Sequence, residues 1–205
     1  MKRLSLLPVV MAICLATPSL RAQAKPDSTS RLSTYTRGDV DFMSGMIYHH
    51  AQAVMIAGWA PTHGASQSVQ ALCERIVVGQ RDEILLLQTW LRNHHEPVPD
   101  PTQAMMPGMA GMGGAHTMMP GMLTAEQLAQ LDSAKGPAFD ELFLRFMIQH
   151  HQGAITMVNQ LFAARGSGEE ETVYRMAANI FGDQTTEIAR MQKMLAPLLF
   201  QGNNP

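Results

Sequence analysis

The chain has 205 residues, of which 46% are hydrophobic, 16% are charged and 6% are aromatic, and its formal net charge is −2. This apolar content is enough for one packed domain, and the small net charge argues against a nucleic-acid-binding protein, which needs a basic surface. With 2 cysteines, neither a disulfide framework nor a cysteine-based zinc site can be assembled. The chain is rich instead in methionine and histidine, with 17 and 8 residues respectively.

The first 24 residues have the pattern of a secretory signal peptide. Lys2 and Arg3 form its positive start, residues 4–15 its apolar stretch, and residues 22–24 its A-x-A cleavage site. The apolar stretch is too short to span a bilayer, and no later one reaches the required length. We therefore expect cleavage after Ala24 and a periplasmic or secreted protein without a membrane span.

Apolar residues then recur at helical spacing, and no useful stretch alternates as a strand would. Helix start and stop signals bound helices over about residues 39–60, 66–96, 124–135, 138–165 and 169–196. Asp39 is the expected N-cap of the first helix, and Pro197 is expected to end the last. Thr124 and Gln127 have the spacing of a capping box.

An internal repeat organises these helices. The first copy reads Met46-x-x-His49-His50-x-x-Ala53, and the second reads Met147-x-x-His150-His151-x-x-Ala154, 101 residues later. A Gln-x-x-Glu-Ile motif follows each copy, at residues 80–84 and 184–188. Two helical hairpins that each carry an apolar stripe can bury it by packing together, which predicts an all-α four-helix bundle. The expected segments are a signal peptide (1–24), a flexible leader (25–37), the bundle domain (38–196) with an inter-hairpin loop (97–123), and a tail (197–205).

The repeated motif has the residue types of a soft-metal site. Thioether sulfur and imidazole nitrogen together favour copper, as Cu(I) or Cu(II), over the metals that prefer oxygen ligands. The candidate ligands are Met46, His49, His50, Met147, His150, His151 and Met157. The polar residues on the partner helices are expected to orient the second ring nitrogen of the histidines, and direct ligation by the two glutamates stays open. These residues are Gln80, Glu83, Gln184 and Glu187.

The loop between the hairpins is rich in methionine, glycine and proline, so it cannot form a helical stripe. We expect its side chains to capture copper at the periphery, and the alternative is a low-complexity linker. The candidates are Met105, Met106, Met109, Met112, His116, Met118, Met119 and Met122. Outside these groups, His63 is expected to be solvated and Cys73 to be a small buried hydrophobe.

Several enzyme classes lack their motifs. There is no H-E-x-x-H zinc-protease pattern, and no glutamate stands three residues before a paired histidine, as di-iron carboxylate bundles require. Haem attachment through C-x-x-C-H is also excluded. We therefore expect no catalytic turnover and no organic cofactor.

The doubled motif and the two Gln-x-x-Glu-Ile helices resemble the domain-of-unknown-function 305 family. The resemblance covers about residues 38–196 and implies an exported, ferritin-like four-helix protein. Some members of that family bind copper and are implicated in copper tolerance. The first motif departs from the second, because Ile56 occupies the place that corresponds to Met157.

The main hypothesis is an exported copper-binding protein that sequesters or transfers copper, with a copper exporter or oxidase as a partner and oligomerisation left open. The first alternative is a structural or interaction module whose buried histidines, glutamines and glutamates form a hydrogen-bond network without metal. A metal-dependent oxidase is the second alternative, for which the bundle lacks the expected carboxylates.

Overall fold

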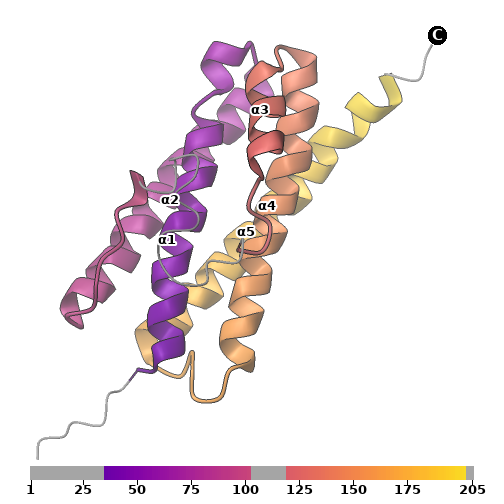
Figure 1. Cartoon of the computed structure of the whole chain (residues 1–205). Coiled ribbons are helices and arrows are strands. Elements are labelled where there is room, and N and C mark those ends of the chain that lie inside the picture. The colour runs from indigo at the N-terminus through magenta and orange to yellow at the C-terminus, as the bar shows by residue number, and fades with distance from the viewer. Residues whose placement is uncertain (1–34, 103–118, 202–205) are drawn as a thin grey trace, which may run out of the picture. The chain divides into compact units, whose positions relative to one another are not determined.

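The computed structural model of the chain describes residues 35–102 and 119–201, with the backbone alone at residues 200 and 201 (Figure 1). The predicted signal peptide (1–24) and residues 25–34 of the predicted leader lie outside the described residues. So does part of the inter-hairpin loop, over residues 103–118.

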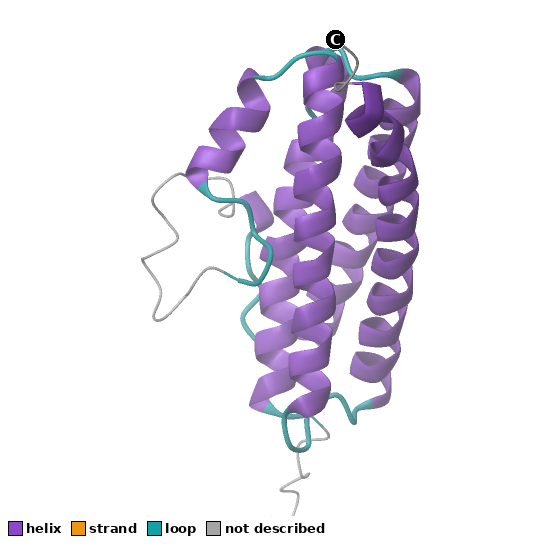
Figure 2. Ribbon diagram, turned by 90° about the vertical axis from the view of Figure 1, so that its right-hand side faces the viewer, coloured by secondary structure: helices purple, strands orange, loops and turns teal. Residues whose placement is uncertain are grey.

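The described residues form helices and no strand. In chain order the elements are α1 (Arg37–Ala57), the short 3-10 helix η1 (Ala60–His63), α2 (Gln67–Asn93), α3 (Ala125–Ser133), α4 (Pro137–Ala163) and α5 (Glu171–Gln201). The hairpins α1–α2 and α4–α5 join through α1 and α4, which cross as antiparallel neighbours, while α3 lies against α4 (Figures 1 and 2). The prediction of an all-α, ferritin-like four-helix bundle built from two hairpins is confirmed.

The helix ends differ from the sequence prediction in two places. The N-cap of α1 is Thr36 rather than Asp39, because Asp39 takes the third helical position of a capping box and its carboxylate accepts from the Thr36 backbone. The prediction that the last helix ends before Pro197 is wrong, since α5 continues through that residue to Gln201. A proline this close to a helix end removes one backbone hydrogen bond and leaves few residues beyond it. The capping box of Thr124 and Gln127 is confirmed at the start of α3.

Two buried aspartates tie each hairpin to the loop of the other. Asp39, at the start of α1, accepts a 2.6 Å hydrogen bond from the Gly168 backbone in the α4–α5 loop. Asp140, 101 residues later at the start of α4, accepts one of 3.1 Å from the Ser66 backbone in the α1–α2 loop. The internal repeat therefore extends to a reciprocal pair of clamps, which fixes how α1 and α4 cross.

The apolar core consists of two clusters of buried side chains, which meet near the repeated histidines on α1 and α4. One cluster includes the buried side chains of α1 up to Ala51 and those of α4 from Ala154 onward. The other includes the buried side chains of α1 from Ala53 onward and those of α4 up to Met147.

No helix in the described part of the chain has the length and apolarity needed to cross a membrane.

The structure corrects the expectation that His63 is solvated. Its side chain is buried, and Nε2 donates to the Asp132 carbonyl at 2.9 Å. Nδ1 lies 2.9 Å from the Trp59 carbonyl. His63 therefore connects η1 to the end of α3 through its own hydrogen bonds. Its isolated position in the sequence gave no periodic signal that it faces inward.

Candidate metal centre

The four repeated histidines meet where α1 and α4 cross in the middle of the bundle. All four are fully buried, with 0% of each residue exposed. The rings of His49 and His150 have centroids 3.9 Å apart, whereas the adjacent pair His49 and His50 are 6.4 Å apart. His150 and His151 are similarly 6.3 Å apart. The structure thus brings together one histidine from each hairpin and directs the other two away from that contact.

The outer two histidines point to the glutamates of the partner helices. His151 Nε2 donates to Glu187 Oε2 at 2.6 Å. His50 Nε2 lies 2.8 Å from Glu83 Oε2, within ion-pair distance but without hydrogen-bond alignment. A carboxylate in this place orients the ring of a metal-binding histidine and raises the basicity of its other nitrogen. Glu83 and Glu187 occupy the positions expected of that role.

The hydrogen bonds of two histidines determine their tautomers. His49 Nε2 lies 3.0 Å from the Pro120 carbonyl, which can only accept, so the proton of this ring is on Nε2. The same reasoning places a proton on Nε2 of His151, which faces a carboxylate. In a neutral ring with its proton on Nε2, Nδ1 carries a lone pair, which is what a metal requires.

These lone pairs are not used within the described part of the chain. Among the described residues, Nδ1 of His49, His50, His150 and His151 has no hydrogen-bond partner, and neither has Nε2 of His150. Each unsatisfied buried polar atom costs about 1–3 kcal/mol, so such a concentration at one crossing calls for a cause. A metal ion bound to one of these nitrogens would supply the partner that the nitrogen lacks.

Burial also keeps the central rings uncharged. It lowers the pKa of His49 from 6.5 to about 3, and the neighbouring His50 adds to the effect. Burial and the other three histidines likewise hold the pKa of His150 well below its usual range. A histidine binds a metal through a ring nitrogen that carries no proton. Because both rings are neutral at neutral pH, each has one such nitrogen, and a metal does not have to displace a proton.

The predicted methionine ligands lie within the two apolar clusters around the histidines. Met46 and Met157 belong to one cluster and Met147 to the other, and all three are buried. Among the described residues, no group of three or more histidine, cysteine or acidic side chains converges as a ready metal site. Met46 and Met147 each lie one helical turn before the histidine pair of their own helix.

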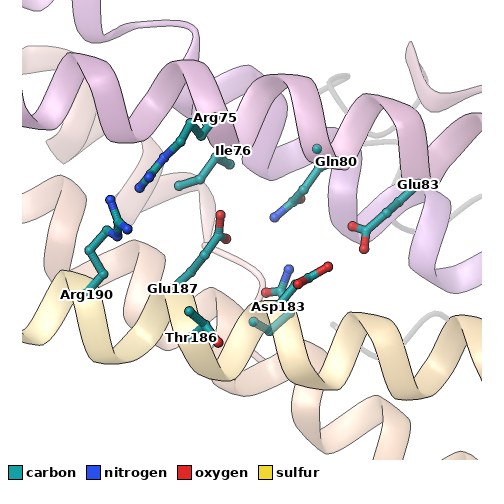
Figure 3. Close-up of a pocket in the computed structure, with 10 residues that line it drawn as sticks. Arg75, Ile76, Gln80, Glu83, Asp183, Thr186, Glu187 and Arg190 are labelled. Carbon is teal, nitrogen blue, oxygen red and sulfur yellow. The ribbon is translucent and has the colours of Figure 1, made fainter.

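A cavity of about 330 Å³ lies between α2 and α5 and is lined mainly by polar and charged residues (Figure 3). Gln80, Glu83, Gln184 and Glu187 all line it. Both amide atoms of buried Gln80 and Oε1 of buried Gln184 lack a hydrogen-bond partner among the described residues. The cavity connects the surface to the carboxylates that contact His50 and His151.

Sequence reasoning missed three charged residues of this cavity. Asp183 lies one turn before Glu187 on the same face of α5, and burial together with the charges of Glu83 and Glu187 raises the pKa of Asp183. Arg75 and Arg190 flank one end, from α2 and α5 respectively (Figure 3). The helical spacing of Asp183 to the Gln-x-x-Glu-Ile motif was the signal that could have identified it.

Cys73 is placed away from the metal chemistry. It is buried in the apolar cluster that contains Leu72 and Ile76, as expected of a small hydrophobe. Burial and the nearby Asp140 charge raise the pKa of the Cys73 thiol to about 12. The thiol therefore stays protonated at neutral pH and does not provide a thiolate ligand.

Most of the methionines predicted to capture copper at the periphery lie outside the described residues. These are Met105, Met106, Met109, Met112 and Met118, together with His116. Met119 and Met122 are described, and both are half-buried. Met119 packs against the apolar cluster that contains Met46 and Met157, so it lies beside the core.

Comparison with known proteins identifies the family of this chain. The family model for the domain of unknown function DUF305 matches residues 39–195. The chain belongs to the DUF305 family. The resemblance drawn from the doubled histidine motif is thereby confirmed. No curated protein matches the chain.

Several solved structures are similar to this chain over nearly their whole length. A DUF305 fragment from Deinococcus radiodurans is 28% identical with a TM-score of 0.66, covering 80% of this chain and 98% of its own. A DUF305 protein from Streptomyces coelicolor is 26% identical with a TM-score of 0.63, covering 78% of this chain and 93% of its own. CopM in the Cu(II)-bound form is 28% identical with a TM-score of 0.60, covering 78% and 96%. CopM also has a solved Cu(I)-bound form.

Proposed function

We propose that this protein is an exported copper-binding protein that sequesters or transfers copper without catalytic turnover. The observation that carries the proposal is the set of four buried histidines at the α1–α4 crossing, whose Nδ1 atoms have no partner among the described residues. Neutral imidazoles beside buried thioethers suit copper better than metals that prefer oxygen. The copper-bound forms of CopM support the same chemistry in a relative.

The proposal that this chain is exported rests on its first 24 residues and on one similar solved structure. The similar DUF305 protein from Streptomyces coelicolor is described as a secreted protein. A soft-metal site in an exported protein would serve to hold copper outside the cytoplasm or to hand it to a copper exporter or oxidase.

The cavity between α2 and α5 is the proposed route by which copper enters. Glu83 and Glu187 both line the cavity and contact buried histidines, so an ion held by either carboxylate lies one side chain away from the crossing. Carboxylates and amides can hold a hydrated cation before imidazole and thioether replace its water.

A metal-free structural network explains the histidines less well. Such a network stabilises a core only when its members are satisfied, and a partly satisfied one is worse than an apolar core. Within the described residues, the nitrogens named above, both amide atoms of Gln80 and Oε1 of Gln184 are unsatisfied. Cu(I) or Cu(II) bound to the native state would also raise the melting temperature, which a metal-free module would not show.

The test is a competition titration of Cu(I) and Cu(II) against chromophoric chelators. In the His50→Gln/His151→Gln variant, the glutamine amide keeps a donor near the position of Nε2 and removes Nδ1, so packing against the glutamates is retained. The matched control is His94→Gln/His95→Gln, which changes an adjacent pair at the end of α2. We expect copper affinity to fall in the first variant and not in the second. Equal affinity in the wild type and in a variant with all four core histidines replaced by glutamine would contradict the proposal.

A further inference from the structure

The last residues before α3 lie against both α1 and α4. We call residues 119–123 the inner strap. Gln52 on α1 grips its backbone, with Nε2 donating to the Leu123 carbonyl at 3.2 Å and Oε1 accepting from the Leu123 N–H at 2.8 Å. One turn earlier, His49 Nε2 donates to the Pro120 carbonyl at 3.0 Å. The inner strap is therefore fastened to the helix that carries the first histidine pair.

On the other side, α4 makes room for the inner strap with a glycine. A Cβ at Gly153 would overlap the Pro120 carbonyl, so no other residue fits there without displacing the strap. Gly121 has φ of 77°, and a Cβ on it would collide with Gly153. The Gln149 amide donates to the Gly121 carbonyl at 3.4 Å. Two glycines in contact thus allow the backbone of the inner strap to lie directly on α4.

This path brings a thioether from the loop to the metal centre. The point where a Cβ on Gly45 would stand is 3.4 Å from Met119 Sδ and also 3.4 Å from Met157 Cε. Gly45 lies one turn before His49 on the same face of α1. The missing side chain at Gly45 therefore opens a notch that two methionines share, beside a histidine whose Nδ1 carries an unused lone pair.

We propose that Met119, Met157 and His49 form a soft-metal site for Cu(I) or Ag(I) that exists only while the inner strap is docked. The inference rests on the proposed copper-binding function and adds to it a ligand supplied by the inter-hairpin loop. Two thioethers and one imidazole favour a soft monovalent ion over Cu(II). Docking of the inner strap also fixes the His49 proton on Nε2, which leaves Nδ1 for the metal.

The first test compares single methionine substitutions in the full mature chain. Met119→Leu keeps the apolar contact and removes the sulfur, and the matched control is Met194→Leu, a partly buried methionine of α5 that packs against the other apolar cluster. Loss of a direct ligand should lower Cu(I) affinity by about tenfold or more, as even the loss of a supporting contact commonly does. Cu(II) affinity should change little. Competition with a Cu(I)-specific chelator under anaerobic, reducing conditions measures the first, and an amino-acid competitor the second.

The second test moves the strap without touching a ligand. Gly153→Ala places a methyl group where the Pro120 carbonyl lies, while alanine suits the interior of α4 better than glycine does, so the bundle should remain folded. We expect Gly153→Ala to lower Cu(I) affinity as much as Met119→Leu. The double variant should be no weaker than either single one, and circular dichroism checks the helix content.

The possible outcomes separate failure of this inference from failure of the proposed function. Wild-type protein that binds Cu(I) no better than Met119→Leu overturns the inference and leaves the proposed function standing. Effects of Met119→Leu and Gly153→Ala that multiply independently also overturn it, because the strap would then not be what delivers Met119. A wild type that binds neither copper ion refutes the proposed function itself, and the inference with it.

Discussion

The two hairpins differ most along the faces of α1 and α4 that correspond by the repeat. On α1 these positions are Gly45, His49 and Gln52, and on α4 they are Phe146, His150 and Gly153. Gln52 binds the backbone of the inner strap, Gly153 makes room for it, and His49 donates to its Pro120 carbonyl. The repeat therefore preserves the scaffold and the histidine pairs, and the residues around them make the two halves of the centre unequal.

The scaffold itself should respond almost symmetrically, and its clamps give the largest expected effect. Asp39 accepts from the Thr36 backbone at 2.7 Å and the Gly168 backbone at 2.6 Å, whereas Asp140 accepts from the Ser66 backbone alone. Charge-assisted hydrogen bonds contribute about 1.5–3 kcal/mol each, so Asp39→Ala should cost about 3 kcal/mol and Asp140→Ala about 2 kcal/mol. Urea unfolding monitored by circular dichroism measures both losses.

The exposed neighbour Asp41 is the control for the clamps. Its ion pair with Arg37 lies on the surface of α1, so Asp41→Ala should change stability by less than about 0.5 kcal/mol. If Asp39→Ala were no worse than Asp41→Ala, the clamp would not hold the hairpins in register.

The central histidines should make the apoprotein sensitive to mild acid. In the folded state the pKa of His49 is about 3 and that of His150 is also lowered, whereas both return to about 6.5 on unfolding. The unfolded chain therefore binds more protons below pH 6.5, and stability falls as the pH drops from 6.5 towards 3. The slope is about 1.4 kcal/mol per pH unit for each such group.

Melting temperatures between pH 7.5 and pH 5, with copper removed by a chelator, are the measurement for this prediction. The His49→Gln/His150→Gln variant should show a flatter profile in that range, since carboxylates titrate mostly below it. A wild-type profile as flat as that of the variant would mean that the rings are protonated or solvated in the native state.

Substitution of the two glutamates should have a smaller effect, on copper affinity, and the size of the effect should differ between them. Glu187 is hydrogen-bonded to His151 at 2.6 Å, whereas Glu83 approaches His50 without alignment. Glu187→Gln should therefore weaken copper binding by about tenfold, the lower end of what losing such an orienting contact costs, and Glu83→Gln by less. Competition titration ranks the two, with Glu74→Gln on the exposed face of α2 as control. If Glu83→Gln weakened copper binding more than Glu187→Gln, the alignment of the glutamate–histidine hydrogen bond would not be what determines copper affinity.

The bundle could be predicted because its signals are periodic. Helical spacing, capping residues and the repeat at Met46 and Met147 each depend on local sequence, and they agree with one another. Pro197 and His63 were misread because a helix tolerates proline near its end and because the burial of a single side chain depends on tertiary contacts. Neither is visible in a sequence window.

Where each site residue lies could be predicted only in part. The motif identified the histidines and the facing glutamates, but spacing along one helix could not show that His49 meets His150 rather than His50. The inner strap was invisible for a similar reason, because Gly153 on α4 makes room for its backbone and Gly45 on α1 makes room for its Met119 side chain. Asp183 was missed because it has no counterpart in the first hairpin, where Gly79 precedes Gln80.

The most direct measurement of the metal centre is a long-range ¹H–¹⁵N NMR spectrum of histidine-labelled protein during stepwise addition of Cu(I). Without metal, His49 should appear as a neutral ring protonated at Nε2, and His151 should carry a proton on Nε2. With metal, the Nδ1 resonances of the core histidines should shift, beginning with His49, while those of His63 and His94 stay in place. Shifts confined to His94, His95 or His116, or no shift at all, would contradict copper binding at the α1–α4 crossing.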